Sequence, residues 1–167
     1  MKRRSFLRTG ILAGVALGGA AVVGRHLSGY SLDGASAKRL RALTAKEFLV
    51  LQAVARRILA SDGPAPSADE VEAPFHADAY LAQLDAPLRD DLRALLHLFE
   101  HTSSLRSRFT RMSAEEQDAT LAAWEASGSV LKRRGFQALK TLCLFGYWRD
   151  DRTWALIGYS GPMVKRG

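Results

Sequence analysis

Two capping boxes fix where helices can begin in this chain. Thr44-x-x-Glu47 and Ser113-x-x-Glu116 each place a hydroxyl residue three positions before a glutamate, at the start of a segment rich in apolar residues. In such a box the hydroxyl accepts a backbone N–H of the first helical turn, and the glutamate accepts the N–H of the capping residue. Each box therefore predicts the first turn of a helix.

The spacing of apolar residues extends this prediction to most of the chain. They recur every three or four positions, and no segment shows the alternation of apolar and polar residues that is typical of a strand. The helices expected on this basis cover residues 44–61, 75–84, 85–102, 113–127 and 129–148. We expect the last helix to bury Val130, Leu131 and Phe145 with its other apolar residues. The prediction is an all-α fold, an irregular bundle of four or five helices with an extended C-terminal tail, preceded by a signal helix.

Length and composition suit one domain held together by apolar burial. The chain has 167 residues, of which 47% are hydrophobic, enough to form a packed core. Cys143 is the single cysteine, so no disulfide can form within the chain. Its apolar neighbours indicate a small buried side chain, and a bridge to another protein is the alternative.

The first 37 residues have the organisation of an export leader. Arg3, Arg4, Phe6 and Leu7 match the twin-arginine consensus, and residues 10–24 form an uncharged stretch rich in glycine and alanine. That stretch is shorter than the roughly 20 residues that a membrane-spanning helix needs. The segment 35–37, Ala-Ser-Ala, supplies a cleavage site. We therefore divide the chain into a leader, 1–37, and a helical domain, 38–167. A leader that is not cleaved would tether the protein to the inner membrane.

The positive charge belongs mostly to this leader. The net charge is +7, and residues 1–37 hold five basic residues against one acidic residue. The remaining +3 is spread among mixed charges and forms no dense cationic stripe. Nucleic-acid binding is therefore not expected.

One motif points to a metal site. His97-x-x-Glu100-His101 matches the inverted zinc-protease motif, with both histidines on one helix face. A second hypothesis is therefore an independent exported metal-binding helical protein, or a hydrolase that uses these three residues. The simpler alternative is a polar helix end. The chain has neither the glycine-rich dinucleotide motif nor a cysteine pair, so we expect no directly bound cofactor and no catalysis by the chain alone.

Three stretches together resemble the gluconate 2-dehydrogenase subunit 3 family. They are the leader motif at 3–7, the segment 43–64 and the aromatic ending at 145–162. The resemblance implies a noncatalytic small subunit that binds the FAD-bearing catalytic subunit of a sugar or alcohol dehydrogenase of the glucose-methanol-choline type. It also implies that this subunit escorts its partner through the twin-arginine translocase to the periplasm, and that a cytochrome c subunit can join the complex. The partner's substrate does not follow from this chain.

The C-terminal tail holds the residues expected to dock such a partner. Large aromatic side chains on an irregular segment are typical of interface anchors. The candidates are Trp148, Trp154, Tyr159, Gly161 and Pro162. The alternative is that Trp154 and Tyr159 fold back and seal the core of the subunit itself.

Overall fold

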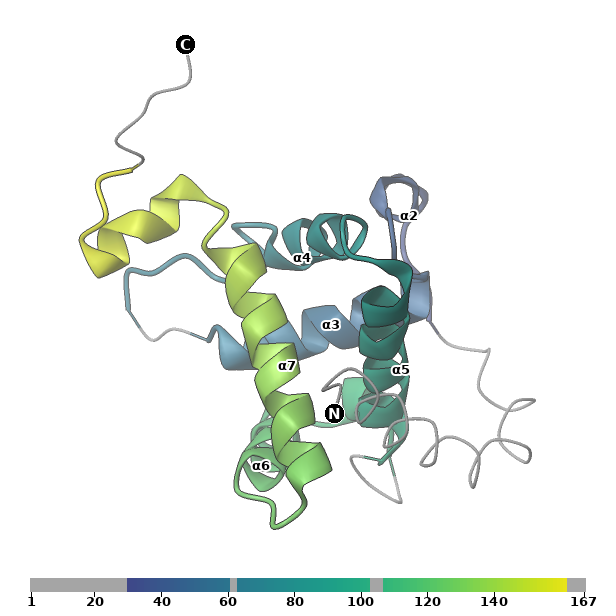
Figure 1. Ribbon diagram of the computed structural model, residues 1–167. Coiled ribbons are helices and arrows are strands. Elements are labelled where there is room, and N and C mark those ends of the chain that lie inside the picture. Colours follow the sequence, from purple (N-terminus) through teal and green to yellow (C-terminus); the bar gives the residue numbers. More distant parts are fainter. Residues whose placement is uncertain (1–29, 61–62, 103–106, 162–167) are drawn as a thin grey trace, which may run out of the picture.

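The described helices of this chain pack into one bundle (Figure 1). The computed structural model describes residues 30–60, 63–102 and 107–161, and within these ranges every regular element is helical. The elements are α2 (Gly34–Arg39), α3 (Ala45–Ile58), α4 (Ala73–Leu81), α5 (Ala86–Thr102), the 3-10 helix η2 (Phe109–Arg111), α6 (Ala114–Glu125), α7 (Val130–Tyr147) and the 3-10 helix η3 (Asp151–Ile157). The predicted all-α class is confirmed.

Both predicted capping boxes are formed. The backbone N–H of Thr44 donates to the Glu47 carboxylate over 2.7 Å, and that of Ser113 donates to Glu116 over 2.9 Å. The two hydroxyls accept the reciprocal N–H groups. The other predicted helices appear as α4, α5 and α7, with ends within a few residues of the expected ones.

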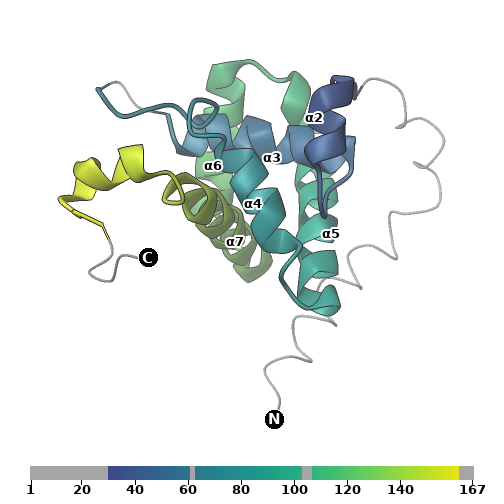
Figure 2. The ribbon, with the colours of Figure 1, turned by 90° about the horizontal axis from the view of Figure 1, so that it is seen from above.

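Helix α7 contacts most of the bundle. It crosses α3, with α6 beside its first half and the start of α4 beside its last turn (Figure 1). Helices α5 and η2 pack against α3. Seen from above, α4 and α7 lie next to each other (Figure 2). The core therefore forms where α3, α4, α5 and α7 meet.

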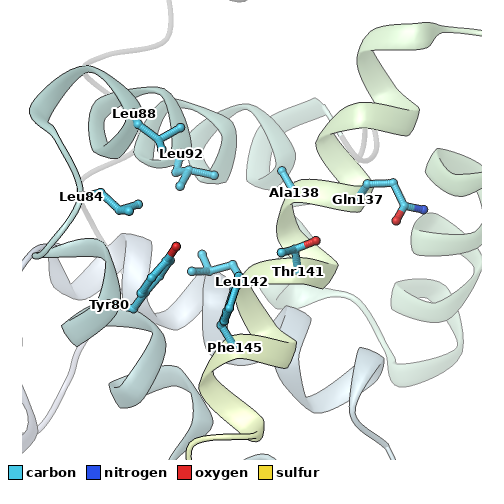
Figure 3. Close-up of a pocket in the computed structure, with 9 residues that line it drawn as sticks. All are labelled: Tyr80, Leu84, Leu88, Leu92, Gln137, Ala138, Thr141, Leu142 and Phe145. Atoms are coloured by element: carbon cyan, nitrogen blue, oxygen red, sulfur yellow. The ribbon is translucent and has the colours of Figure 1, made fainter.

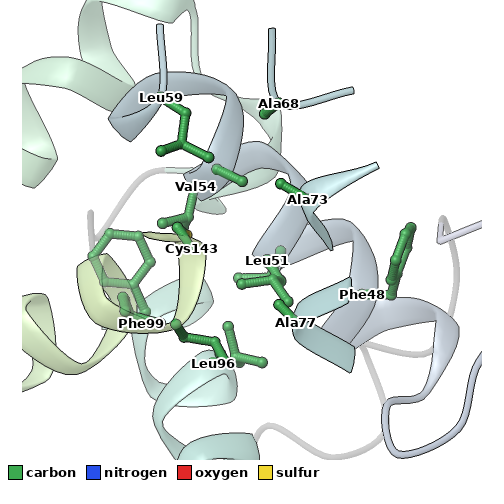
Figure 4. Packing of buried hydrophobic residues seen from close by; sticks show 14 of the residues in the cluster. Phe48, Leu51, Val54, Leu59, Ala68, Ala73, Ala77, Leu96, Phe99 and Cys143 are labelled. Atoms are coloured by element: carbon green, nitrogen blue, oxygen red, sulfur yellow. The ribbon is translucent and has the colours of Figure 1, made fainter. Parts of the chain in front are cut away.

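The centre of the core combines aliphatic and aromatic side chains (Figure 4). Leu51 of α3, Leu96 of α5 and Cys143 of α7 are each fully buried. Phe99 contacts Phe109, with 4.6 Å between ring centroids, and meets Trp124 edge-on at 4.7 Å. Burial raises the pKa of the Cys143 thiol to about 12, so this cysteine acts as the small apolar side chain that its neighbours predicted.

Three apolar residues of α7 are not where the sequence placed them. Val130, Leu131 and Phe145 were expected inside, but they are 50%, 41% and 54% exposed. The buried face of α7 is made instead by residues 135, 136, 139, 142, 143, 146 and 147. Val130 and Leu131 precede this face, and Phe145 lies on the opposite side of the helix from Cys143.

The C-terminal tail is less extended than predicted. Residues 151–157 form η3, which starts where the Asp150 carboxylate accepts the N–H of Arg152 and ends at Gly158 in a left-handed conformation. The buried Thr153 hydroxyl lies 2.6 Å from the carbonyl oxygen of Asp150. Within the described part of the tail, residues 158–161 follow η3 without helix.

The predicted leader lies mostly outside the described residues, including Arg3, Arg4, Phe6, Leu7 and the uncharged stretch 10–24. Its last part is described: residues 30–33 lead into α2, which carries the segment 35–37. No helix in the described ranges is both long enough and apolar enough to cross a membrane.

Close packing of α7 on α4 requires a glycine. A Cβ atom added to Gly146 would lie 2.2 Å from the carbonyl oxygen of Ala73, well inside van der Waals contact. The neighbouring atom is backbone, so it cannot move aside without shifting α4.

Replacing Gly146 by alanine should therefore destabilise the fold. We expect the free energy of unfolding to fall by about 2 kcal/mol, as in other overpacked cores. Gly128→Ala is the matched control, because a Cβ at Gly128 meets nothing within 4 Å. Urea unfolding followed by circular dichroism measures both variants, and equal stabilities would contradict the packing described here.

Candidate functional site

An apolar hollow opens between α7 and the end of α4, the following turn and the first half of α5 (Figure 3). Its volume is about 290 Å³. Leu84, Leu88 and Leu92 line one side, and Ala138, Leu142 and Phe145 of α7 line the other. Because Leu88 and Phe145 are both substantially exposed, the hollow lies at the surface with its apolar wall uncovered.

Two stacked aromatic rings border this hollow. Tyr80 of α4 and Phe145 of α7 lie nearly parallel, with 4.9 Å between their centroids and 22° between their planes. Phe145 covers the Tyr80 ring on one side and leaves 54% of its own surface exposed. Rigid aromatic side chains that stand out from a helix in this way are typical anchors of protein interfaces.

A second, more polar hollow lies on the other side of the stacked pair. It has a volume of about 620 Å³ and shares Tyr80 and Phe145 with the first hollow. Arg41, Arg149 and His76 supply basic groups to its lining, and Trp148 supplies an aromatic one. None of its lining residues is acidic. The two hollows together form one face, here called the α4–α7 face, that is apolar at one end and positively charged at the other.

The predicted docking residues divide between this face and the tail. Trp148 lines the polar hollow, whereas the indole N–H of Trp154 donates to the carbonyl oxygen of Trp148 over 3.0 Å. Trp154 also meets Tyr159 edge-on at 5.3 Å, and Gly161 packs close to its ring. Pro162 lies outside the described residues. The structure thus folds the tail back onto the end of α7, while Tyr159 remains nearly half exposed.

Phe145, Tyr80 and Leu88 are missing from the residues predicted to dock. They belong to helices whose apolar residues all looked like core in the sequence. A second stripe on α7 could have indicated this face from the sequence. Its residues follow one another at intervals of four and so share one side of the helix: Gln137, Thr141 and Phe145. That stripe is separate from the buried one.

The residues of the predicted metal motif each turn to partners of their own. His97 Nε2 lies 3.0 Å from the Glu47 carboxylate, and His101 Nε2 lies 2.8 Å from Lys46 Nζ. Glu100 is fully buried, and it accepts the hydroxyl of Thr110 over 2.7 Å. In the part of the chain that the structure describes, no three His, Cys, Asp or Glu side chains gather as metal ligands would. The motif residues join separate contacts between helices.

Glu47 is the centre of the largest of these contacts. Its side chain is only 2% exposed, and Arg93 Nε lies 3.1 Å from one carboxylate oxygen. Burial raises the pKa of Glu47, but hydrogen bonds from His97, from the backbone and hydroxyl of Thr44, and from Arg93 outweigh it and bring the pKa to about 2. The carboxylate stays ionised because donors surround it.

The depressed pKa of Glu47 predicts a loss of stability in acid. Its ordinary pKa of 4.5 applies to the unfolded chain and about 2 to the folded chain, so ionised Glu47 stabilises the fold above pH 4.5. This contribution, about 3 kcal/mol, should disappear as the pH falls from 4.5 to 2.

Glu47→Gln should lower stability at neutral pH and flatten this part of the acid profile. Urea unfolding at a series of pH values gives the profile. Glu125→Gln is the control, because Glu125 is half exposed, and its profile should follow that of the unmodified protein. If the stability of Glu47→Gln fell with acid as steeply as that of the unmodified protein, ionised Glu47 would not be the source of this pH dependence.

The fold and the α4–α7 face thus describe a small helical domain with an uncovered apolar surface. The chain belongs to the gluconate 2-dehydrogenase subunit 3 family, whose model matches residues 45–161. The matched region contains α3 to α7 and η3. It includes every residue of the two capping boxes except Thr44. No curated protein sequence and no solved structure matches the chain. Family membership makes it a subunit of a dehydrogenase complex.

Proposed function

We propose that this chain is the noncatalytic small subunit of an FAD-dependent dehydrogenase of the glucose-methanol-choline type, and that it escorts the catalytic subunit through the twin-arginine translocase. FAD is held by the partner, which oxidises a sugar or an alcohol. The complex works in the periplasm, where a cytochrome c subunit can accept its electrons. Membership of the subunit 3 family is the observation that carries this proposal.

The α4–α7 face is the surface that we assign to the catalytic subunit. Phe145 supplies an exposed aromatic anchor, and the apolar hollow beside it can receive a side chain of the partner. Arg41 and Arg149 in the second hollow favour a partner that places acidic residues there. The catalytic subunit should therefore present an apolar group flanked by carboxylates.

The leader supports the export part of the proposal. Its paired arginines and weakly hydrophobic stretch are typical of proteins that cross the membrane already folded. A catalytic subunit must bind its flavin before it leaves the cytoplasm, so a folded route suits it. One leader on the small subunit then serves both proteins.

Phe145→Asp should prevent docking. Placing a charge at the centre of the α4–α7 face should reduce recovery of the catalytic subunit about tenfold or more when the two chains are co-expressed and the small subunit is purified by a tag. Leu131→Asp is the control, because Leu131 is also an exposed apolar residue of α7 but does not line either hollow.

Thermal unfolding of both isolated variants shows whether they fold. A folded Phe145→Asp variant that still recovers its partner in full would rule out this surface as the docking site.

Changing Arg3 and Arg4 together to lysine should stop export of both subunits. The change keeps the charge but removes the paired guanidinium groups of the motif. We expect flavin absorbance and the masses of both chains to disappear from the periplasmic fraction and remain in the cytoplasm. Arg25→Lys, outside the motif, should leave export unchanged. Export of the catalytic subunit alongside the lysine variant would contradict the escort role.

A further inference from the structure

The segment 30–43 is fastened to the helical bundle, although its first part was assigned to the leader. Asp78 of α4 is almost fully buried, and its carboxylate accepts three successive backbone N–H groups. They come from Arg41 over 2.6 Å, Ala42 over 3.0 Å and Leu43 over 2.8 Å. Together the three bonds hold residues 41–43 against α4.

Arg39 makes the next attachment. Its guanidinium donates two hydrogen bonds to the Glu72 carboxylate, over 2.8 and 2.7 Å, and lies 3.9 Å from the centroid of the Phe75 ring. Leu32 and Leu40 pack against the core on either side of α2. An exposed ion pair contributes little alone, but here it acts together with apolar burial at both ends of the helix.

Tyr30 makes the attachment furthest from the domain in sequence. Its hydroxyl donates to the carboxylate of Glu100, which is fully buried and otherwise accepts only from Thr110 among its described hydrogen bonds. Arg108 and Lys46 approach the Tyr30 ring, at 5.3 and 5.5 Å from its centroid. Loss of Tyr30 would remove one donor from a buried carboxyl group, which is costly.

The predicted cleavage site lies inside this attached segment. Residues 35–37 are part of α2, and the Asp33 carboxylate caps that helix by accepting the N–H groups of Ala35 and Ser36 over 3.0 and 2.9 Å. Proteases cut where backbone can be exposed and extended. Cutting after Ala37 therefore requires α2 to unwind. The family model begins at residue 45, so residues 30–43 precede the matched region, whereas Glu72, Asp78 and Glu100, which hold them, lie within it.

We propose that residues 30–43 are a permanent part of the folded domain, and that the exported protein is not cut after Ala37 and keeps Tyr30. The inference rests on the export part of the proposed function. If the chain is exported already folded, a signal peptidase meets residues 35–37 as part of the helix α2. Removal of the leader, where it occurs, takes place before Tyr30.

The first test is the N-terminus of the exported protein. The full chain carrying a C-terminal tag is produced with its catalytic subunit and recovered from the periplasmic and membrane fractions. Its intact mass and N-terminal sequence are then determined. A chain that starts before Tyr30 is expected, and a chain that starts at Lys38 would overturn the inference while leaving the escort role intact.

The second test needs no export. Tyr30→Phe in the purified full chain removes only the hydroxyl that donates to Glu100, and the midpoint of thermal unfolding should fall by about 4 °C. Tyr159→Phe is the matched control, because the Tyr159 ring is nearly half exposed, and its midpoint should not change. Equal midpoints for the two variants would overturn the inference, even if the protein failed to be exported.

Discussion

Three buried carboxylates organise one end of this bundle. Glu47, Asp78 and Glu100 are each 2% exposed or less, and a buried polar group is stable only when hydrogen-bond partners surround it. The donors come largely from the chain that precedes or begins α3: the backbone of residues 41–44, the Thr44 hydroxyl and the Tyr30 hydroxyl. The carboxylates therefore fix the N-terminal segment against α4 and α5 at the same time as they fix those helices against α3.

The position of α7 follows from this arrangement. With α3 and α4 held together, α7 approaches the backbone of α4 closely at Gly146, which lies opposite Ala73 and has no side chain. That contact sets the rotation of the helix about its own axis. It turns Cys143 into the core and turns Phe145 outward onto Tyr80. The α4–α7 face is thus a result of how the core packs.

The sequence could predict what depends on neighbours along the chain. The capping boxes at Thr44 and Ser113 and the five main helices rest on local hydrogen bonds and on spacing, and all of them appear in the structure. Helix α2 was missed because its apolar contacts and its Arg39–Glu72 pair join residues far apart in sequence.

The same limit applies to side-chain direction. Spacing placed His97 and His101 on one helix face, but could not show that Glu47 and Lys46 meet them there. Likewise, Phe145 is apolar and lies in an apolar run, and only the packing of Gly146 on α4 decides that it points outward. Local pattern identifies the helices, whereas tertiary contacts decide which of their faces remain available.

Arg41 belongs both to the attached segment 30–43 and to the α4–α7 face. Its backbone N–H donates to the buried Asp78, and the residue also lines the polar hollow beside Trp148. A partner seated on the α4–α7 face therefore contacts the same stretch of chain that follows α2. A partner that binds only one state of a protein stabilises that state. A docked partner that contacts Arg41 would therefore also favour the state in which residues 30–43 are attached. If the catalytic subunit docks on this face as we propose, its docking and the attachment of this segment would support each other through Arg41.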